Sequence, residues 1–319
     1  MNKFRVFVVV LVLFSFKTFA CLNGDTKVLK NGVEVYYDEF ERIPEGHRFI
    51  VENFPKLIQD LEEQYKKTND IDYLSDKGYV LIISGKYQEA LKLYLEIEKL
   101  KPNRYSTASN LGTLYELMGE NQNAFNWIKK SIQINPESHK GSEWLHLKIL
   151  EAKIKNLKEV SGEFLINTTF GLEKTPKTNL SKKELEELKK ALYYQLNERI
   201  TFIKPKDRII SVLLFELGNI AIINKDYLSA SQIYELSKKY GFQEELINKR
   251  TILCYEKWVH YYSSKAEELE MQKGGSFRLE GYQIDAVVIS LIIVSLFFLS
   301  LLIYCIVLFR KLKKANVST

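Results

Sequence analysis

Two stretches of the sequence decide the fold: LSDKGYVLIISGKYQEALKLYLEIEKLKP at residues 74–102 and ASNLGTLYELMGENQNAFNWIKKSIQINP at residues 108–136. Aligned at an offset of 34 residues, they agree at four positions that carry glycine, alanine or proline. The pairs are Gly78 with Gly112, Gly85 with Gly119, Ala90 with Ala124, and Pro102 with Pro136. A fixed period of this length indicates a repeated supersecondary unit.

Each of these residue types has a physical reason at its place in the unit. We predict that Gly78 and Gly112 lie in the first helix of their units, where a side chain would block the second helix. Gly85 and Gly119 mark the short turn, which needs a positive φ or a helix end. A proline then follows the second helix and starts the next connection.

This 34-residue helix–turn–helix pattern resembles the tetratricopeptide repeat, although the early Trp of that family is absent from both units. The resemblance implies an all-α solenoid that buries one continuous core. Its repeat domain spans 69–156, with units at 71–104 and 105–138 and a capping helix at 139–156.

A further unit returns later in the chain. Gly218 and Ala230 reproduce the spacing of twelve residues that separates Gly78 from Ala90. We therefore expect repeat-like helices over residues 206–280. Whether the two repeat blocks form one solenoid stays open.

Residues 157–205 form an insertion between the two blocks. The stretch 163–169 reads as a strand or extended link. Ser181, with Glu184 three residues later, predicts a capping box that opens the helix of the insertion.

The segment 21–68 leads into the repeats. Asn31-Gly32 stands between two β-prone runs in residues 27–37, and this dipeptide is the strongest short-range signal for a β-hairpin. A flexible loop is the alternative interpretation.

The first twenty residues have the features of a secretory signal peptide. Lys3 and Arg5 precede the apolar run Val6 to Phe16, which is too short to span a bilayer. Small residues then precede a cleavage position ahead of Cys21. Simple cleavage and lipidation of Cys21 both remain open.

Residues 286–309 contain no charged residue, glycine or proline. As a helix they would be about 36 Å long, enough to cross the hydrocarbon core of a bilayer. Four basic residues follow in the tail 310–319, and positive flanks stay in the cytoplasm. We therefore expect a single-pass inner-membrane protein with residues 21–285 in the periplasm and a cytoplasmic tail.

The net charge is +6, and the pI of about 8.9 would suit a nucleic-acid-binding protein. However, the signal carries three of the positive charges and the tail four, and neither contains an acidic residue. The region between them has a formal charge of −1, so nothing in the exported part favours nucleic acid.

Three further stretches extend the resemblance: ACLNG at 20–24, YQLNER at 194–199 and LLFELGN at 213–219. They are similar to exported tetratricopeptide-repeat proteins of Bacteroidetes-type bacteria. The resemblance covers most of the exported region and implies no enzymatic activity.

The sequence contains no motif that predicts catalysis, a cofactor or a metal site. Nucleotide-binding glycine motifs and the G-x-S-x-G nucleophile motif are absent. The four histidines lack metal-ligand spacing, and His139 and His146 are interpreted as a solvated or partly buried pair. Cys254 reads as an inert core residue, with a disulfide to Cys21 as the alternative.

We therefore predict a scaffold that binds a periplasmic protein or peptide in the concave groove formed by the first helices. The residues expected to line this groove are Tyr79, Ile82, Ile83, Asn110, Thr113, Lys140 and Glu143. Packing of the groove residues against a neighbouring element such as 40–68 is the alternative. Two other functions stay open: an envelope enzyme, or accessory subunit, with its site in 157–205, and a sensor that signals through a membrane partner.

Overall fold

The computed structural model describes residues 24–39, 42–272, 277–279 and 282–284. The chain divides into two compact units, Met1–Lys257 and Trp258–Thr319, and each is considered by itself. The expected signal peptide, Cys21, the apolar segment 286–309 and the tail lie outside the described residues. Among the residues that are described, none of the helices has the length and apolar character to cross a membrane.

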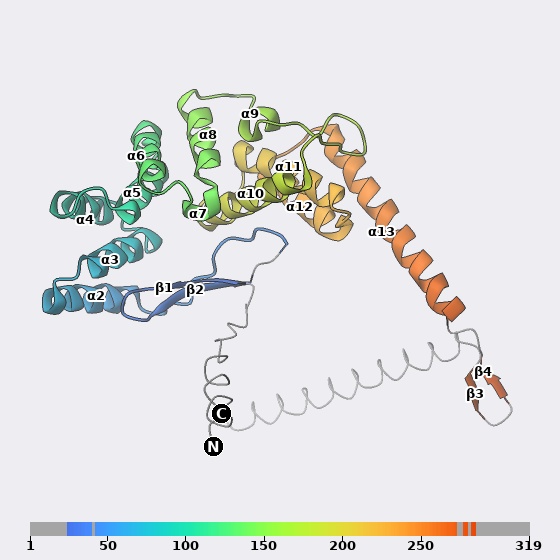
Figure 1. The fold of residues 1–319 in the computed structure, drawn as a ribbon, viewed down its shortest axis with the longest axis horizontal. Coiled ribbons are helices and arrows are strands. Elements are labelled where there is room, and N and C mark those ends of the chain that lie inside the picture. Colours follow the sequence, from blue (N-terminus) through green and yellow to red (C-terminus); the bar gives the residue numbers. More distant parts are fainter. Residues whose placement is uncertain (1–23, 40–41, 273–276, 280–281, 285–319) are drawn as a thin grey trace, which may run out of the picture. The chain divides into compact units, whose positions relative to one another are not determined.

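The first unit is built mainly of helices that follow one another in antiparallel pairs (Figure 1). Three of these pairs have the predicted repeat pattern: α3 (Ile71–Ile83) with α4 (Tyr87–Leu100), α5 (Tyr105–Leu117) with α6 (Asn121–Ile134), and α11 (Arg208–Ile223) with α12 (Tyr227–Tyr240).

The same close contact recurs in all three pairs and confirms the role predicted for the helix glycines. A Cβ atom added to the glycine of the first helix would overlap a buried side chain of the second helix. The contacts, with the distance from that Cβ position, are Gly78 with Tyr94 at 2.6 Å, Gly112 with Ile128 at 2.3 Å, and Gly218 with Tyr234 at 2.4 Å. Glycine is therefore required here by space, because each pair of helix axes lies closer than a side chain allows.

The turn glycines are needed for a different reason. Gly85 and Gly119 have φ angles of +78° and +80°, and nothing lies within 4 Å of a Cβ placed on either. Backbone conformation, and not space, selects glycine at these two turns. In the α11–α12 turn, Lys225 takes the same left-handed region at φ 61°.

The hairpin predicted around Asn31-Gly32 is present. Strands β1 (Gly24–Val28) and β2 (Glu34–Glu39) pair antiparallel, and Gly32 takes a φ of +83° in the turn. Helix α2 (Phe54–Thr68) follows. Leu29 and Val35 of the hairpin segment are buried against α2 and α3, so the hairpin closes the first end of the helical array (Figure 1).

The insertion departs from the prediction at one place. Residues 163–169 were expected to form a strand or extended link, but Gly162–Ile166 form the short helix α9. Ser161 caps this helix by accepting the amide of Phe164 at 3.1 Å, and Asn167 ends it at φ 53°. The apolar run in α9 packs on α8 and α11, and this tertiary contact outweighs its β propensity.

The capping helix predicted at 139–156 forms as two separate helices, and the helix predicted for the insertion is present. After α7 (Ser138–Gly141) and α8 (Glu143–Ile154), the chain passes through α9 to the long helix α10 (Lys182–Phe202). The capping box of Ser181 and Glu184 is formed in both directions, at 3.3 and 2.8 Å. The largest core lies where α8, α9, α10, α11 and α12 meet.

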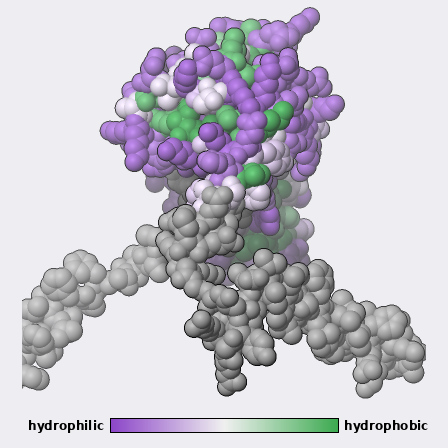
Figure 2. All heavy atoms as spheres, turned by 90° about the vertical axis from the view of Figure 1, so that its right-hand side faces the viewer, coloured by the Kyte–Doolittle hydropathy of each residue, from purple (hydrophilic) through white to green (hydrophobic). Residues whose placement is uncertain are grey.

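Helix α13 (Glu245–Gln272) closes this core and continues into the second unit, which includes strands β3 (Phe277–Leu279) and β4 (Tyr282–Ile284). Cys254 is buried, and burial raises the pKa of its thiol to about 12, as expected of an inert core residue. The surface on the side of α13 is mostly hydrophilic, with apolar residues gathered near its middle (Figure 2).

Candidate functional site

The face formed by the first helices is covered by other parts of the same chain. Ile82 is buried in the core between α3, α4 and α5. Tyr79 and Ile83 pack against the β1–β2 hairpin, and the ammonium group of Lys27 lies 5.2 Å from the centre of the Tyr79 ring. The residues expected at the start of the groove therefore meet the hairpin.

The next predicted groove residues face inward or meet α10. Asn110 of α5 donates its side-chain amide to the hydroxyl of Tyr94 in α4 at 2.8 Å, so it bonds to the preceding repeat. Thr113 lines a small cavity between α5 and α10. Glu143 is almost fully buried, and Lys140 lies in α7, with its side chain outside the described atoms. Partner binding by these residues stays a prediction, but the structure does not leave them as one open surface.

A second feature of this face is a cluster of charges around Glu116 of α5. His146 and Lys153 of α8 each lie 2.7 Å from its carboxylate, and Arg199 of α10 donates to it at 3.2 Å. Burial alone would raise the pKa of Glu116, but these three cationic partners hold it well below its usual value. Helix α10 is thus attached to the first helices by a buried, fully charged cluster.

His139 and His146 are joined through Glu143. His139 Nδ1 lies 2.7 Å from one oxygen of this carboxylate, and His146 Nδ1 lies 3.1 Å from the other. His146 is buried and His139 is partly exposed, as the sequence interpretation of a partly buried pair expects. In the part of the chain that the structure describes, no group of histidine, cysteine or acidic residues is placed to hold a metal ion.

A third feature connects the N-terminal segment to α10 through His47. Its ring lies between Asp38, with which it shares a short hydrogen bond, and Glu198, at 2.9 Å from Nε2. Tyr36 stacks on the imidazole with ring centres 4.0 Å apart. Burial alone would lower the pKa of His47, but the bonds to Glu198 and Asp38 outweigh burial and raise it. We call Asp38, His47 and Glu198 the histidine clasp.

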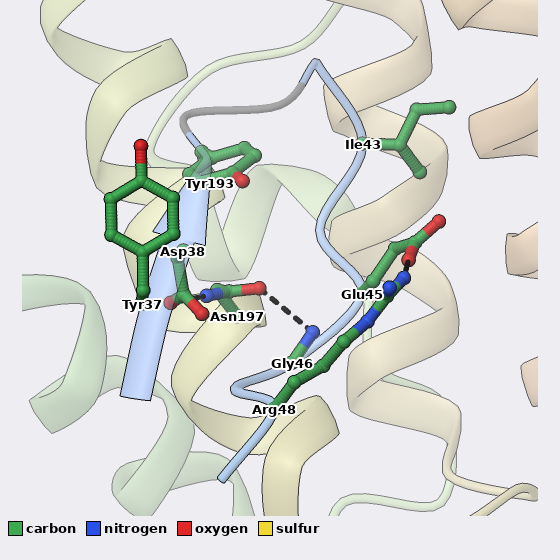
Figure 3. A pocket seen from close by; sticks show the side chains of 8 residues that line it. All are labelled: Tyr37, Asp38, Ile43, Glu45, Gly46, Arg48, Tyr193 and Asn197. Atoms are coloured by element: carbon green, nitrogen blue, oxygen red, sulfur yellow. Dashed lines mark hydrogen bonds and ion pairs between the residues drawn. The ribbon is translucent and has the colours of Figure 1, made fainter. Parts of the chain in front are cut away.

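The backbone beside the clasp is equally constrained. The amide of Gly46 donates to Asn197 Oδ1 at 2.8 Å, and Asn197 donates to Asp38 at 3.1 Å (Figure 3). A Cβ on Gly46 would lie 2.8 Å from the backbone nitrogen of Thr201, and its φ is +84°. Glycine is therefore required where the loop crosses α10.

Two cavities border this covered face. The one beside the clasp has a volume of 280 Å³ and is lined by Tyr37, Tyr193 and an ion pair of Glu45 with Arg48 (Figure 3). The one beside Glu116 has a volume of 40 Å³, room for about two waters. The acidic and basic groups near α10 pair with one another.

A buried polar cluster also fixes the far end of the insertion. Arg250 of α13 is fully buried and donates to Asn219 at 2.7 Å and to the carbonyl of Gly171 at 2.6 Å. Asn219 in turn donates to Glu216 at 2.9 Å, and burial raises the pKa of Glu216 to about 7. These bonds hold the loop that follows α9 against α11 and α13.

The sequence interpretation missed the groups that hold the structure together: His47, Glu116, Arg199 and Arg250. One of the buried polar clusters could have been inferred from the sequence. Glu216 stands inside the apolar run 209–222, and a buried carboxylate there requires a polar partner. Nothing in the sequence showed that the partners would come from α10 and α13, or that His47 would lie between two carboxylates.

The comparisons with known proteins agree with the repeat. A family model described as tetratricopeptide repeat matches residues 106–138, which include α5 and α6. No curated protein matches the chain.

Two solved structures are similar to parts of this chain. One is MamA of Desulfovibrio magneticus RS-1, from residue 41 to its end, and the other is a tetratricopeptide repeat protein of Parabacteroides merdae ATCC 43184. The first is 15% identical, covers 59% of this chain and 85% of its own, and has a TM-score of 0.33. The second is 16% identical, covers 62% and 91%, and has a TM-score of 0.26. Both scores are too low to indicate a shared overall arrangement.

The family match and the glycine contacts therefore carry the identification together. In the matched pair α5–α6, Gly112 lies against Ile128. The pairs α3–α4 and α11–α12 have the same kind of glycine contact. Residues 106–138 are therefore identified as a tetratricopeptide repeat, and two further helix pairs of the chain share its glycine contact.

Proposed function

We propose that the chain is a membrane-anchored scaffold that holds a protein partner outside the cytoplasm. The observation that carries this proposal is the repeat itself: three helix pairs with the same close contact, one of them matched by the family model. Stacked helix pairs of this kind expose extended surfaces on which partner segments dock. The repeat region is nearly neutral, which suits a protein partner better than a nucleic acid.

The location is supported by sequence features alone. Residues 1–20 have the pattern of a signal peptide, and 286–309 are long and apolar enough to span a bilayer. Export in the manner of the Bacteroidetes-type proteins and single-pass anchoring in the inner membrane, with 21–285 in the periplasm, belong to this proposal.

Protease treatment tests the location. The full chain, with an epitope tag after Thr319, is expressed in a Gram-negative host, and protease is added to intact spheroplasts. We expect digestion down to a small tagged fragment that comprises 286–319. A tagged chain that stays at full length, although a periplasmic control is digested, would refute the topology.

Crosslinking in the same cells tests the scaffold function. A photo-reactive amino acid is placed at exposed positions on each helix pair of the full chain, for example at Leu100, whose side chain is 65% exposed. We expect discrete adducts with one partner at a contiguous set of positions. Adducts that contain only this chain, at every position, would refute the proposal.

A further inference from the structure

The open groove of the first unit lies outside the covered concave face. It has a volume of 620 Å³ and is lined by residues of α7, α8, the end of α9 and the first half of α10. This volume is within the range of about 300–1,000 Å³ that is usual for ligand pockets. Among the residues whose side chains are described, neither the hairpin nor the predicted concave groove contributes to its lining.

The floor of the groove is apolar. Trp144 of α8 and Leu180, just before α10, are partly exposed there and pack on the largest core. Ile166, Leu188 and Ala191 complete the floor and are buried. A partly exposed Trp over an apolar floor is the kind of anchor that dominates protein–protein contacts, because its large ring is desolvated on binding.

The rim of the groove is acidic. Glu137, Glu184 and Glu187 line it, and all three are exposed. Among the lining residues whose side chains are described, Lys190 is the cationic one, and Lys183, outside the lining, lies 3.8 Å from the carboxylate of Glu187. The groove therefore presents a net negative rim to a partner, and Coulomb attraction favours cationic side chains there.

The opposite side of α10 carries the opposite sign. A second groove, of 580 Å³, is lined by Arg42, Lys182, Lys189 and Lys225 against Glu186 and Asp226. Its apolar residues Leu217 and Ile233 are buried, so it lacks an exposed apolar anchor. One helix thus separates an acidic groove that has partly exposed apolar residues from a basic groove whose apolar residues are buried.

We propose that the groove between α8 and α10 docks a basic amphipathic segment of a partner protein. Apolar residues of that segment contact Trp144 and Leu180, and its lysine or arginine side chains pair with Glu137 and Glu187. This inference rests on the proposed scaffold function and names the chemistry of its partner. The acidic rim disfavours nucleic acid and acidic peptides by repulsion.

A binding titration tests the proposal. The full chain is reconstituted in phosphatidylcholine nanodiscs and titrated against a fluorescein-labelled twelve-residue peptide. Leucine stands at every third or fourth position of this peptide, and lysine stands elsewhere. We expect saturable binding by fluorescence anisotropy after subtraction of empty nanodiscs. A peptide with glutamate in place of lysine should not bind.

Two charge reversals on the same helix locate the site. Glu187→Lys alters the acidic groove, whereas Glu186→Lys makes the same change on the side of α10 that faces the basic groove. Both residues are solvent-exposed in one helix, so both variants should keep the fold. Glu187→Lys should weaken the binding of the lysine peptide about tenfold, and Glu186→Lys should change it less than twofold. Equal loss in both variants, or no loss in either, would overturn the proposal.

The apolar floor supplies a second measurement. Trp144→Ala should weaken the lysine peptide about tenfold or more, in a variant whose thermal unfolding stays cooperative. Salt should reduce binding to the parent chain much more than binding to Glu187→Lys. A Trp144→Ala variant that is folded and binds the peptide as tightly as the parent would overturn the apolar part of the proposal, and with it the site.

Crosslinking in cells separates this inference from the scaffold function. If adducts with a partner form with Glu186→Lys but are lost with Glu187→Lys, the groove is the docking site. If both variants keep the adducts, the groove proposal is overturned and the scaffold proposal stands. If the parent chain gives no partner adduct at all, both proposals are overturned.

Discussion

The glycine contact of the second repeat gives the sharpest test of the fold. Gly112→Ala adds a Cβ that would lie 2.3 Å from Cδ1 and 2.6 Å from Cγ1 of Ile128. Ile128 is fully buried, so its side chain cannot move into solvent to relieve the overlap. Forced overpacking of this kind typically costs about 1–3 kcal/mol.

An opposing effect has to be set against this cost. Replacing glycine by alanine inside a helix stabilises the helix by about 1 kcal/mol, because the unfolded chain loses conformational freedom. The net expectation for Gly112→Ala is a loss of about 0–2 kcal/mol in the free energy of unfolding. Without the contact with Ile128, the same substitution would stabilise the protein.

The assay is a double-mutant cycle measured by chemical denaturation of the full chain. Gly112→Ala is compared in the parent chain and in an Ile128→Ala background, where the overlapping carbons are gone. There the substitution should lose its penalty and become neutral or stabilising by up to about 1 kcal/mol. A Gly112→Ala chain that is more stable than the parent, or equal effects in both backgrounds, would refute the close contact on which the repeat assignment rests.

Three further predictions concern groups described above. His47→Gln should lower stability by about 2 kcal/mol at pH 6, because charged His47 bridges two carboxylates. The pKa of His47 is raised in the folded protein, so this loss should shrink as the pH rises through that pKa. Thermal unfolding between pH 5.5 and 9 measures it. Glu216→Gln should raise stability by about 3 kcal/mol at pH 8 and little at pH 4. A buried acid with a pKa of about 7 destabilises the fold increasingly from about pH 4.5 to 7. A denaturation series that shows no such pH dependence would contradict this prediction. Ser181→Ala should cost about 1 kcal/mol through loss of the capping box, and Ser181→Thr, which keeps the hydroxyl, should restore most of it.

The local structure was predictable wherever one residue type decides it. The period of 34 identified the units because Gly112 and Gly119 are required for two separate reasons, space in one case and a positive φ in the other. The Asn31-Gly32 turn and the Ser181 capping box are equally local, and both are present. Turns and helix caps of this kind depend on residues that are close together in the sequence, so the sequence alone predicts them.

The arrangement of the site was not predictable, because it depends on contacts between residues far apart in the sequence. Helix α10 covers the first helices because Arg199 reaches Glu116, 83 residues earlier in the chain. His47 reaches Glu198 over 151 residues. A repeat pattern predicts that first helices share one face, but it carries no information about which other segment of the chain covers that face.

The energetics of this cover decide where a partner can dock. If a partner displaced α10 from α5, the buried ion pair of Arg199 with Glu116 would be broken, at a cost in free energy. Separation of the histidine clasp and of the aromatic contact between Phe49 and Phe202 would add to that cost. Single domains are stable by only about 5–15 kcal/mol, so such a cost weighs against opening the face. The groove between α8 and α10 requires no such opening, because Trp144 and the rim carboxylates are already accessible there. A partner therefore binds at lower cost on the outer side of α10 than beneath it.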